Sequence, residues 1–286
     1  MTLVRLRAGA LELALAPDVG GSVAAFSQGG RRLMRPAPDG YTDVLQAACF
    51  PLVPYSNRVR DGVFSFRGRE VRLPPNLPPQ RHPLHGVGWR ASWTVTSAEP
   101  SRAVLALEWP GGVWPWPFQA EQAFALDDAG LSVALRVENT GRQAMPAGLG
   151  LHPYFPCPPG TVLHAPVTEV WPVDADLFPT GREPADGRYS LDQRAISGVG
   201  LDNGYGGWSG EALIRWPDGG GLRITAEPPA RWFQVYAPEG EPVLCAEPVT
   251  HANGALNAPE AEARALGLAV LEPGEHLMLR ARFDPL

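Results

Sequence analysis

The sequence predicts an all-β protein, a large antiparallel β-sandwich formed as a single domain by residues 1–286. Apolar residues alternate with polar residues over short stretches, which is the period of a half-buried strand. Turn residues, supplied by 32 glycines and 32 prolines, separate these stretches at intervals of roughly 8–12 residues, the spacing of a sandwich or barrel. No linker, charge run or repeat divides the chain, and 44% of its residues are apolar. A chain of this length and composition can bury a substantial core.

Each expected strand follows from local alternation, beginning with Leu11–Leu15, which leads into a turn at Asp18–Gly21. Residues 63–73 predict a hairpin around the turn 67–69, because the apolar positions on both sides fall on one face. The clearest hairpin joins Phe118–Leu126 to Leu131–Val137 through the turn at 127–130. The other expected strands are residues 93–96, 104–109, 212–216, 222–226, 232–236, 243–246 and 277–283. Only residues 258–266 suggest a helix.

Composition excludes several classes of function. The formal charge of −6 argues against nucleic acid as a partner, since that binding needs a concentrated basic face. All 24 basic residues are arginine, so neither a Schiff-base lysine nor a phosphate-loop lysine is available. No stretch approaches the length of a membrane span, and the N-terminus lacks the apolar run of a signal peptide. We expect a cytoplasmic protein that is a monomer or a homodimer and has no membrane partner.

The three cysteines, Cys49, Cys157 and Cys245, are far apart in the sequence and form no CxxC motif. This spacing predicts buried free thiols rather than disulfides or a zinc knuckle.

Polar residues that suit a site gather in the loops between Pro51 and Trp93. Asn57 and Arg58 lie in a loop before the expected hairpin, and His82 and His85 follow it. His82 and His85 form an HxxH pair, but no third ligand of a fitting type is near in sequence, so we expect no metal. His85 could equally be a turn histidine that is bonded to the backbone.

Further candidates come from the second half of the chain. His152 precedes Pro153, which holds its backbone extended, so it is either an acid with a shifted pKa or a histidine at a strand end. Glu247 ends the apolar run 243–246, where a carboxylate must be paired or functional because an unpaired buried charge is costly. Asp202 is either a turn aspartate or a ligand for hydroxyl groups, beside Trp208 as a stacking ring.

Motifs of other chemistries are missing from the sequence. There is no GxSxG elbow, and the glycines at 204, 206, 207 and 210 do not form the dinucleotide fingerprint. The remaining set of carboxylates, histidines, one arginine and aromatic rings suits a neutral, hydroxyl-rich ligand and proton transfer without a cofactor.

At these positions the chain resembles the aldose 1-epimerase (galactose mutarotase) family. The resemblance covers nearly the whole chain, in the order Asn57-Arg58, Leu84-His85-Gly86, His152-x-Tyr154-Phe155, Asp202, and Glu247-x-x-Thr250 with Asn253. It implies a large β-sandwich of the galactose mutarotase type (a supersandwich) and interconversion of the α and β anomers of an aldose. It further implies Glu247 as general base, His152 as general acid, and Arg58, His85 and Asp202, with Asn57 beside them, as groups that hold sugar hydroxyls. The resemblance gives His82 and Trp208 no role.

Three other functions stay open at this point. The first is a mutarotase for a hexose 6-phosphate, with Arg31, Arg32 or Arg35 binding the phosphate. The second is a glycoside hydrolase that uses Asp202 and Glu247 as its two carboxylates. The third is a sugar-binding or sensing module without turnover, which would need neither a base nor an acid.

Overall fold

Strands make up most of the ordered elements in residues 2–286, which are the residues that the structure, a computed structural model, describes. The four-stranded sheet contains, in spatial order, β1 (Val4–Ala8), β2 (Leu11–Ala16), β3 (Ser22–Gln28) and β4 (Arg31–Arg32). The nine-stranded sheet contains β18 (Arg194–Ala195), β15 (Val162–His164), β20 (Glu211–Arg215), β21 (Gly221–Ala226), β25 (His276–Pro285), β11 (Leu131–Asn139), β10 (Phe118–Leu126), β9 (Arg102–Trp109) and β8 (Thr94–Ala98).

The third large sheet carries the candidate site. It contains, in spatial order, β17 (Glu183–Pro184), β16 (Glu169–Trp171), β19 (Leu201–Gly206), β22 (Trp232–Ala237), β23 (Val243–Val249), β13 (Gly150–Leu151) and β5 (Pro51–Leu52), and β14 (Tyr154–Pro156) also pairs with β23. Two ribbons complete the fold, β6 (Val63–Phe66) with β7 (Arg69–Arg72) and β12 (Met145–Ala147) with β24 (Ala269–Leu271).

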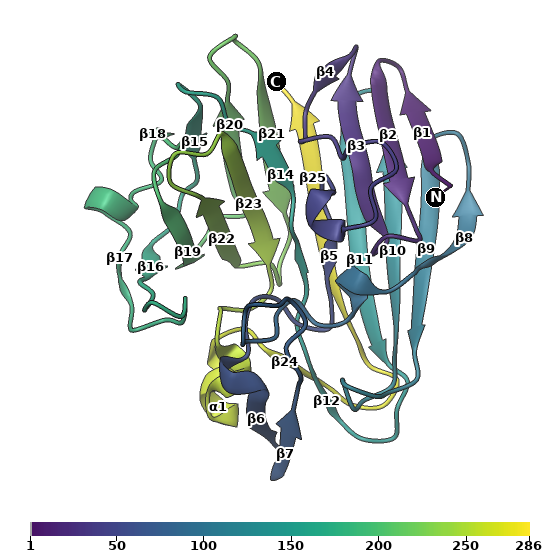
Figure 1. The fold of residues 1–286 in the computed structure, drawn as a ribbon, viewed down its shortest axis with the longest axis vertical. Helices are drawn as coiled ribbons and strands as arrows, with labels where there is room; N and C mark the ends of the chain where they lie inside the picture. The colour runs from purple at the N-terminus through teal and green to yellow at the C-terminus, as the bar shows by residue number, and fades with distance from the viewer. Residues whose placement is uncertain (1) are drawn as a thin grey trace.

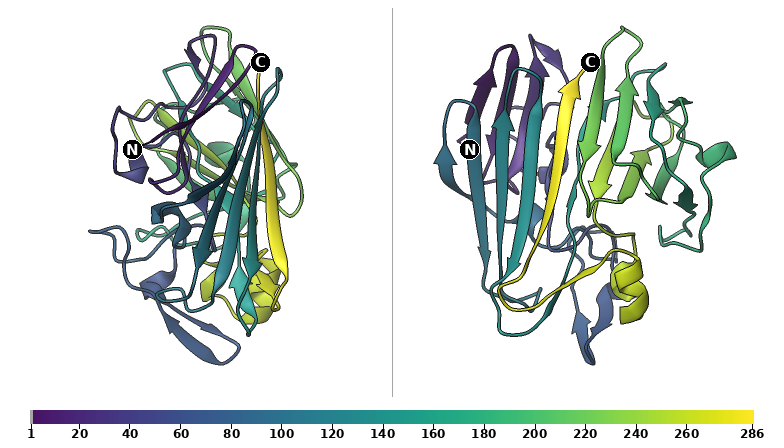
Figure 2. Two further views of the ribbon diagram at one scale, coloured as in Figure 1. Left: turned by 90° about the vertical axis from the view of Figure 1, so that its right-hand side faces the viewer. Right: turned by 180° about the vertical axis from the view of Figure 1, so that it is seen from behind.

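The β-sheets stack as two layers, as the side view in Figure 2 shows. The nine-stranded sheet forms one layer. The eight-stranded and four-stranded sheets together form the second layer, which packs against it (Figures 1 and 2). Alternate residues of facing strands fill the space between them, for example Leu135 and Leu279 from one layer and Phe233 and Leu244 from the other. The prediction of an antiparallel β-sandwich is confirmed.

Local predictions with strong alternation are confirmed closely. The hairpin of β10 and β11 pairs Leu126 with Leu131 around the turn at 127–130. The ribbon of β6 and β7 turns through Arg67 and Gly68, both at positive φ, the conformation that a two-residue hairpin turn requires. The expected helix is present as the short α1 (Glu260–Ala265), and none of the helices in residues 2–286 is long and apolar enough to cross a membrane.

The strand β23 separates core from site by simple alternation. Leu244 and Ala246 point into the space between the layers and belong to the main core. Cys245 and Glu247 therefore lie on the opposite face of the eight-stranded sheet, where Cys245 packs in a second, smaller apolar cluster with Phe50 and Tyr154. Glu247 is also buried on this face, where it is an ionisable side chain next to an apolar cluster.

Candidate active site

The floor of the candidate site is built from two rows of residues that cross the strands. In the first row Glu247 of β23 lies opposite Gln234 of β22, and Gln234 lies opposite Gly204 of β19. In the second row Cys245 lies opposite Tyr236, and Tyr236 lies opposite Asp202. Since residues two apart on a strand share a face, both carboxylates rise from the same surface of the sheet.

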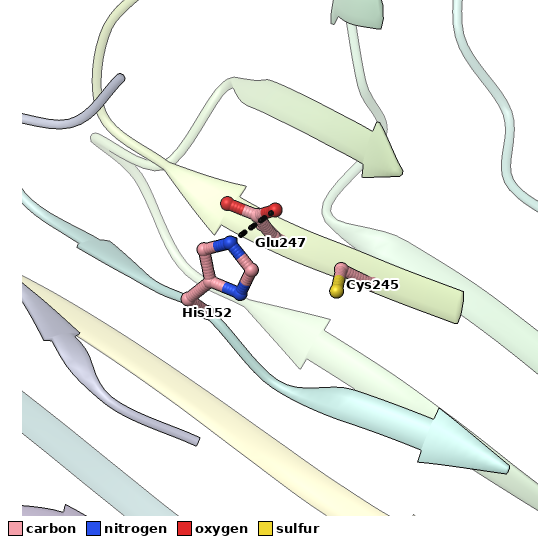
Figure 3. A group of neighbouring side chains, drawn as sticks. All are labelled: His152, Cys245 and Glu247. Carbon is pink, nitrogen blue, oxygen red and sulfur yellow. Dashed lines mark ion pairs between the residues drawn. The ribbon is translucent and has the colours of Figure 1, made fainter. Parts of the chain in front are cut away.

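Strand register also places His152 against Glu247. The short strands β13 and β14 both pair with β23, so that Gly150 faces Val249 and Tyr154 faces Cys245. His152, midway between them, comes opposite Glu247, and its backbone N–H donates to the carbonyl of Phe50 at 3.0 Å. Its Nε2 lies 3.4 Å from Oε1 of Glu247, and Figure 3 marks this contact with a dashed line.

Aromatic rings surround the imidazole of His152. Phe50 stacks on it with ring centroids 4.5 Å apart, Tyr154 lies at 4.8 Å, and His85 meets it edge-on at 5.4 Å. Burial, assisted by the charges of Arg35 and Arg58, lowers the pKa of His152 to about 3. Burial therefore favours the neutral form of the imidazole, and the rings around it hold it in one orientation.

Glu247 shifts in the opposite direction. Burial raises the pKa of Glu247 well above its ordinary value, and the Asp202 carboxylate adds to this effect while Arg58 opposes it. The two groups together then hold one proton, either as a neutral carboxyl beside a neutral imidazole or as a carboxylate beside an imidazolium. Burial favours the neutral arrangement, and the 3.4 Å contact relates one arrangement to the other through a single proton transfer.

Two loops complete the site and are bonded to each other. The N–H of Asn57 donates to Nδ1 of His85 at 3.2 Å, and the N–H of His85 donates to the carbonyl of Asn57 at 2.9 Å. Both residues adopt positive φ, 58° for Asn57 and 63° for His85, a conformation that asparagine and histidine visit more readily than most residues. Such strained positions are held only where the surrounding structure determines them, as at ligand sites.

Arg58 is the positive charge at the centre of this group. Its guanidinium donates to Oδ1 of Asn57 at 3.2 Å, and its charge affects the pKa values of Asp202, Glu247 and His85. Burial lowers the pKa of His85 well below its ordinary range and raises that of Asp202. A sugar that enters here would meet donors and acceptors held in fixed positions.

The structure thus brings together six of the eight residues that the sequence indicates: Asn57, Arg58, His85, His152, Asp202 and Glu247. Trp208 is a correction. Its indole is 1% exposed, stacks on Phe233 at 4.6 Å and donates to the carbonyl of Glu211, so no face is open to a ligand. It packs in the core because it follows the end of β19, where the chain turns back into the sandwich.

His82 also lies outside the group. Its Nδ1 accepts from the N–H of Asp61 at 2.9 Å, and its ring meets Phe178 edge-on. In His85 the Nδ1 lone pair accepts from the N–H of Asn57, so Nδ1 of each histidine is bonded to a different backbone N–H.

The sequence prediction missed Gln234. Its Nε2 donates to Oδ1 of Asp202 at 2.8 Å, and it stands between the two carboxylates on the floor. Together with Asn57, Asn253 and Glu247 it lines a narrow crevice of about 10 Å³. A polar residue at the centre of the apolar strand Trp232–Tyr236 was the signal that could have revealed it.

Cys245 was expected only as a buried free thiol, and the structure confirms this state for all three cysteines. Its position is less ordinary, because one ligand atom each from His152, Cys245 and Glu247 lie within 4.8 Å of one another (Figure 3).

Comparison with known proteins agrees with the geometry. The sequence model of the aldose 1-epimerase family matches residues 2–284. The chain belongs to the aldose 1-epimerase family. The uncharacterized protein YphB of Escherichia coli (strain K12) is 32% identical over 286 residues, which cover 96% of each chain.

Solved structures extend the family likeness to the fold. A crystal structure of an Escherichia coli K12 protein, provisionally named as an aldose 1-epimerase, matches with a TM-score of 0.90 at 30% identity and covers 100% of this chain and 99% of that one. A galactose mutarotase-like protein from Clostridium acetobutylicum matches with a TM-score of 0.87, covering 99% and 94% of the two chains. At 18% identity that second likeness shows the fold alone.

Proposed function

We propose that this member of the aldose 1-epimerase family interconverts the α and β anomers of an aldose, with Glu247 as the base and His152 as the acid. The observation that carries the proposal is the buried contact of 3.4 Å between His152 Nε2 and Glu247 Oε1 on the floor of the site. Opposite pKa shifts in a buried pair are a mark of acid and base chemistry. Here they favour a protonated Glu247 and a neutral His152, the protonation that the pair has while the sugar is open.

Ring opening needs one proton removed and one supplied. The Glu247 carboxylate takes the proton of the C1 hydroxyl, the His152 imidazolium gives a proton to the ring oxygen, and the C1–O5 bond breaks to leave an open aldehyde. The pair ends as a neutral carboxyl and a neutral imidazole, the arrangement that burial favours. Rotation about C1–C2 and the reverse transfers then close the ring as the other anomer.

Because the pair keeps one proton throughout the cycle, no proton has to come from solvent between opening and closure. General acid and base catalysis each contribute about 10²–10⁴ in rate. Arg58, whose charge acts on Asp202, Glu247 and His152, supplies positive charge where negative charge builds on the sugar oxygens. In this proposal Asp202, which accepts from Gln234, and His85, which accepts from Asn57, hold hydroxyl groups of the sugar.

Two of the three arginines considered for a 6-phosphate, Arg31 and Arg35, are engaged elsewhere, which favours a free aldose, while Arg32 is exposed. Arg31 is paired with Asp218, far along the chain on the turn after β20. The guanidinium of Arg35 donates to the carbonyls of Leu45 and Ala47 and lies over the ring of Tyr154 at 3.8 Å. Neither offers the free fork that binds phosphate.

The test is the rate of anomerisation of freshly dissolved α-sugars, followed by polarimetry or by NMR, over a panel of aldoses with and without a 6-phosphate. We expect acceleration of at least one free aldose and loss of this acceleration in His152→Gln. A matched control is His82→Gln, which changes a buried histidine outside the group and should keep the rate. An inactive protein across the whole panel, or an unimpaired His152→Gln variant, would refute the assignment.

A further inference from the structure

Cys245 has no part in the acid–base reaction, yet it lies inside the site. It is two residues before Glu247 on β23 and on the same face, opposite Tyr154 in the register that also sets His152. Its thiol is fully buried and free. The side chains of Cys245, His152 and Glu247 all project into the same space, as Figure 3 shows.

The three side chains are a complete set of ligand types for a thiophilic metal ion. One ligand atom from each lies within 4.8 Å of the others, and all three residues are buried. His152, which is 8% exposed, also has a buried Nδ1 without a hydrogen-bond partner among the described residues. The nitrogen that faces Glu247 is Nε2, so Nε2 would bind the ion, while the Nδ1 side of the ring has no structural hydrogen bond within residues 2–286.

We propose that His152, Cys245 and Glu247 form a binding site for one thiophilic divalent cation such as Zn²⁺, and that this ion inhibits the protein by occupying its acid and its base. The binding site stands on the geometry alone. The inhibition rests on the proposed function.

The distances suit zinc with a small adjustment. Zinc binds imidazole nitrogen, thiolate sulfur and carboxylate oxygen at about 2.0–2.3 Å in a tetrahedron, which places neighbouring ligand atoms about 3.3–3.7 Å apart. The contact between His152 and Glu247 already measures 3.4 Å. The remaining separations, at most 4.8 Å, need to shorten by about 1 Å, which a rotation of the Cys245 side chain can supply.

Ligand chemistry selects the class of cation. A thiolate and an imidazole favour zinc and similar ions, whereas magnesium and calcium prefer sites made of oxygen alone. On binding, the cysteine thiol and the carboxyl group lose their protons to solvent, and their two negative charges balance the charge of the ion. Three protein ligands leave a fourth position for water.

Inhibition follows from the same contacts. A metal ion bonded to Glu247 and His152 leaves neither the carboxylate to take the C1 proton nor the imidazolium to protonate the ring oxygen. An aldose and Zn²⁺ therefore compete for the site, and each lowers the apparent affinity of the other.

The experiment titrates the full-length protein with Zn²⁺ by calorimetry and with Co²⁺ by absorption. We expect one ion per chain and the near-ultraviolet charge-transfer band of a thiolate bonded to Co²⁺. Cys245→Ala should abolish the band and weaken Zn²⁺ binding by about tenfold or more, since one of three ligands is gone. Cys157→Ala removes another buried free thiol outside the site and is the matched control.

Several outcomes decide the matter. Equal Zn²⁺ affinity in wild type and Cys245→Ala, or a Co²⁺ complex without a thiolate band, would overturn the site. Cys245→Ser gives a nearly isosteric second variant if the alanine variant does not fold, and the Co²⁺ spectrum of the wild type needs no variant. A third outcome is that Zn²⁺ binds through Cys245, that excess aldose does not weaken this binding, and that the protein has no anomerase activity. This outcome would refute the proposed function and the inhibition, but not the metal site.

Discussion

Replacing Glu247 by glutamine should reduce the rate of anomerisation without reducing the stability of the fold. Glutamine keeps the size of the side chain and reproduces the neutral carboxyl that burial favours in the folded protein. It cannot accept the C1 proton. We expect the rate of anomerisation to fall by about 10²–10⁴, which corresponds to about 3–5 kcal/mol of lost transition-state stabilisation.

The same substitution should stabilise the protein relative to the wild type, by an amount that grows as pH rises. A carboxyl group with a raised pKa binds its proton more tightly in the folded chain than in the unfolded one. The contribution of Glu247 to the free energy of unfolding is therefore largest below the pKa of glutamate in the unfolded chain, about 4.3. This contribution falls by about 1.4 kcal/mol for each pH unit between that value and the raised pKa of Glu247. Glutamine does not titrate, so its advantage should grow with pH over this window.

Two assays measure these effects together. NMR exchange or polarimetry gives the rate with the best aldose of the panel, and urea unfolding at several pH values gives the free energy of unfolding. Glu239→Gln is the matched control, since Glu239 is exposed on a loop after β22. A Glu247→Gln variant that anomerises sugar at the wild-type rate would refute the base assignment, and a rate loss accompanied by reduced stability would point to folding instead.

Further predictions concern the surroundings of the pair. Phe50→Leu removes one ring from the imidazole of His152. The pKa of His152 should then rise toward the ordinary value, and the acidic limb of the pH–rate profile should move to higher pH. Gln234→Leu removes the donor to Asp202, and KM should rise by about tenfold with a smaller change in kcat, since a hydrogen bond to a charged group contributes about 1.5–3 kcal/mol. Burial lowers the pKa of His251 to about 4. As pH falls from about 6.5 to 4, this histidine should lower the free energy of unfolding by about 3 kcal/mol. The wild type should therefore lose stability more steeply in acid than His251→Asn. Gly148→Ala would place a Cβ 1.9 Å from the ring of His251 and should lower the free energy of unfolding by about 1–3 kcal/mol, whereas Gly181→Ala, which meets no neighbour, should not.

The sequence by itself determined the class of fold and most of the polar residues of the site. Alternation and turn residues act over a few positions, so the hairpin of β10 and β11 could be predicted with its turn. Short strands such as β13 and β14 escaped because two or three residues carry no period. Glu247 stood out because it follows the apolar run 243–246, although the strand continues to Val249, and the family resemblance added the role of His152.

Only the tertiary structure decided which of these residues meet. Alternation tells which face of a strand a residue occupies, but the choice of neighbouring strand and register depends on contacts far apart in the chain. Register places His152 opposite Glu247 and adds Gln234 and Cys245 to the same surface. It also encloses Trp208 in the core, although its sequence neighbourhood of polar and glycine residues resembles that of a surface loop.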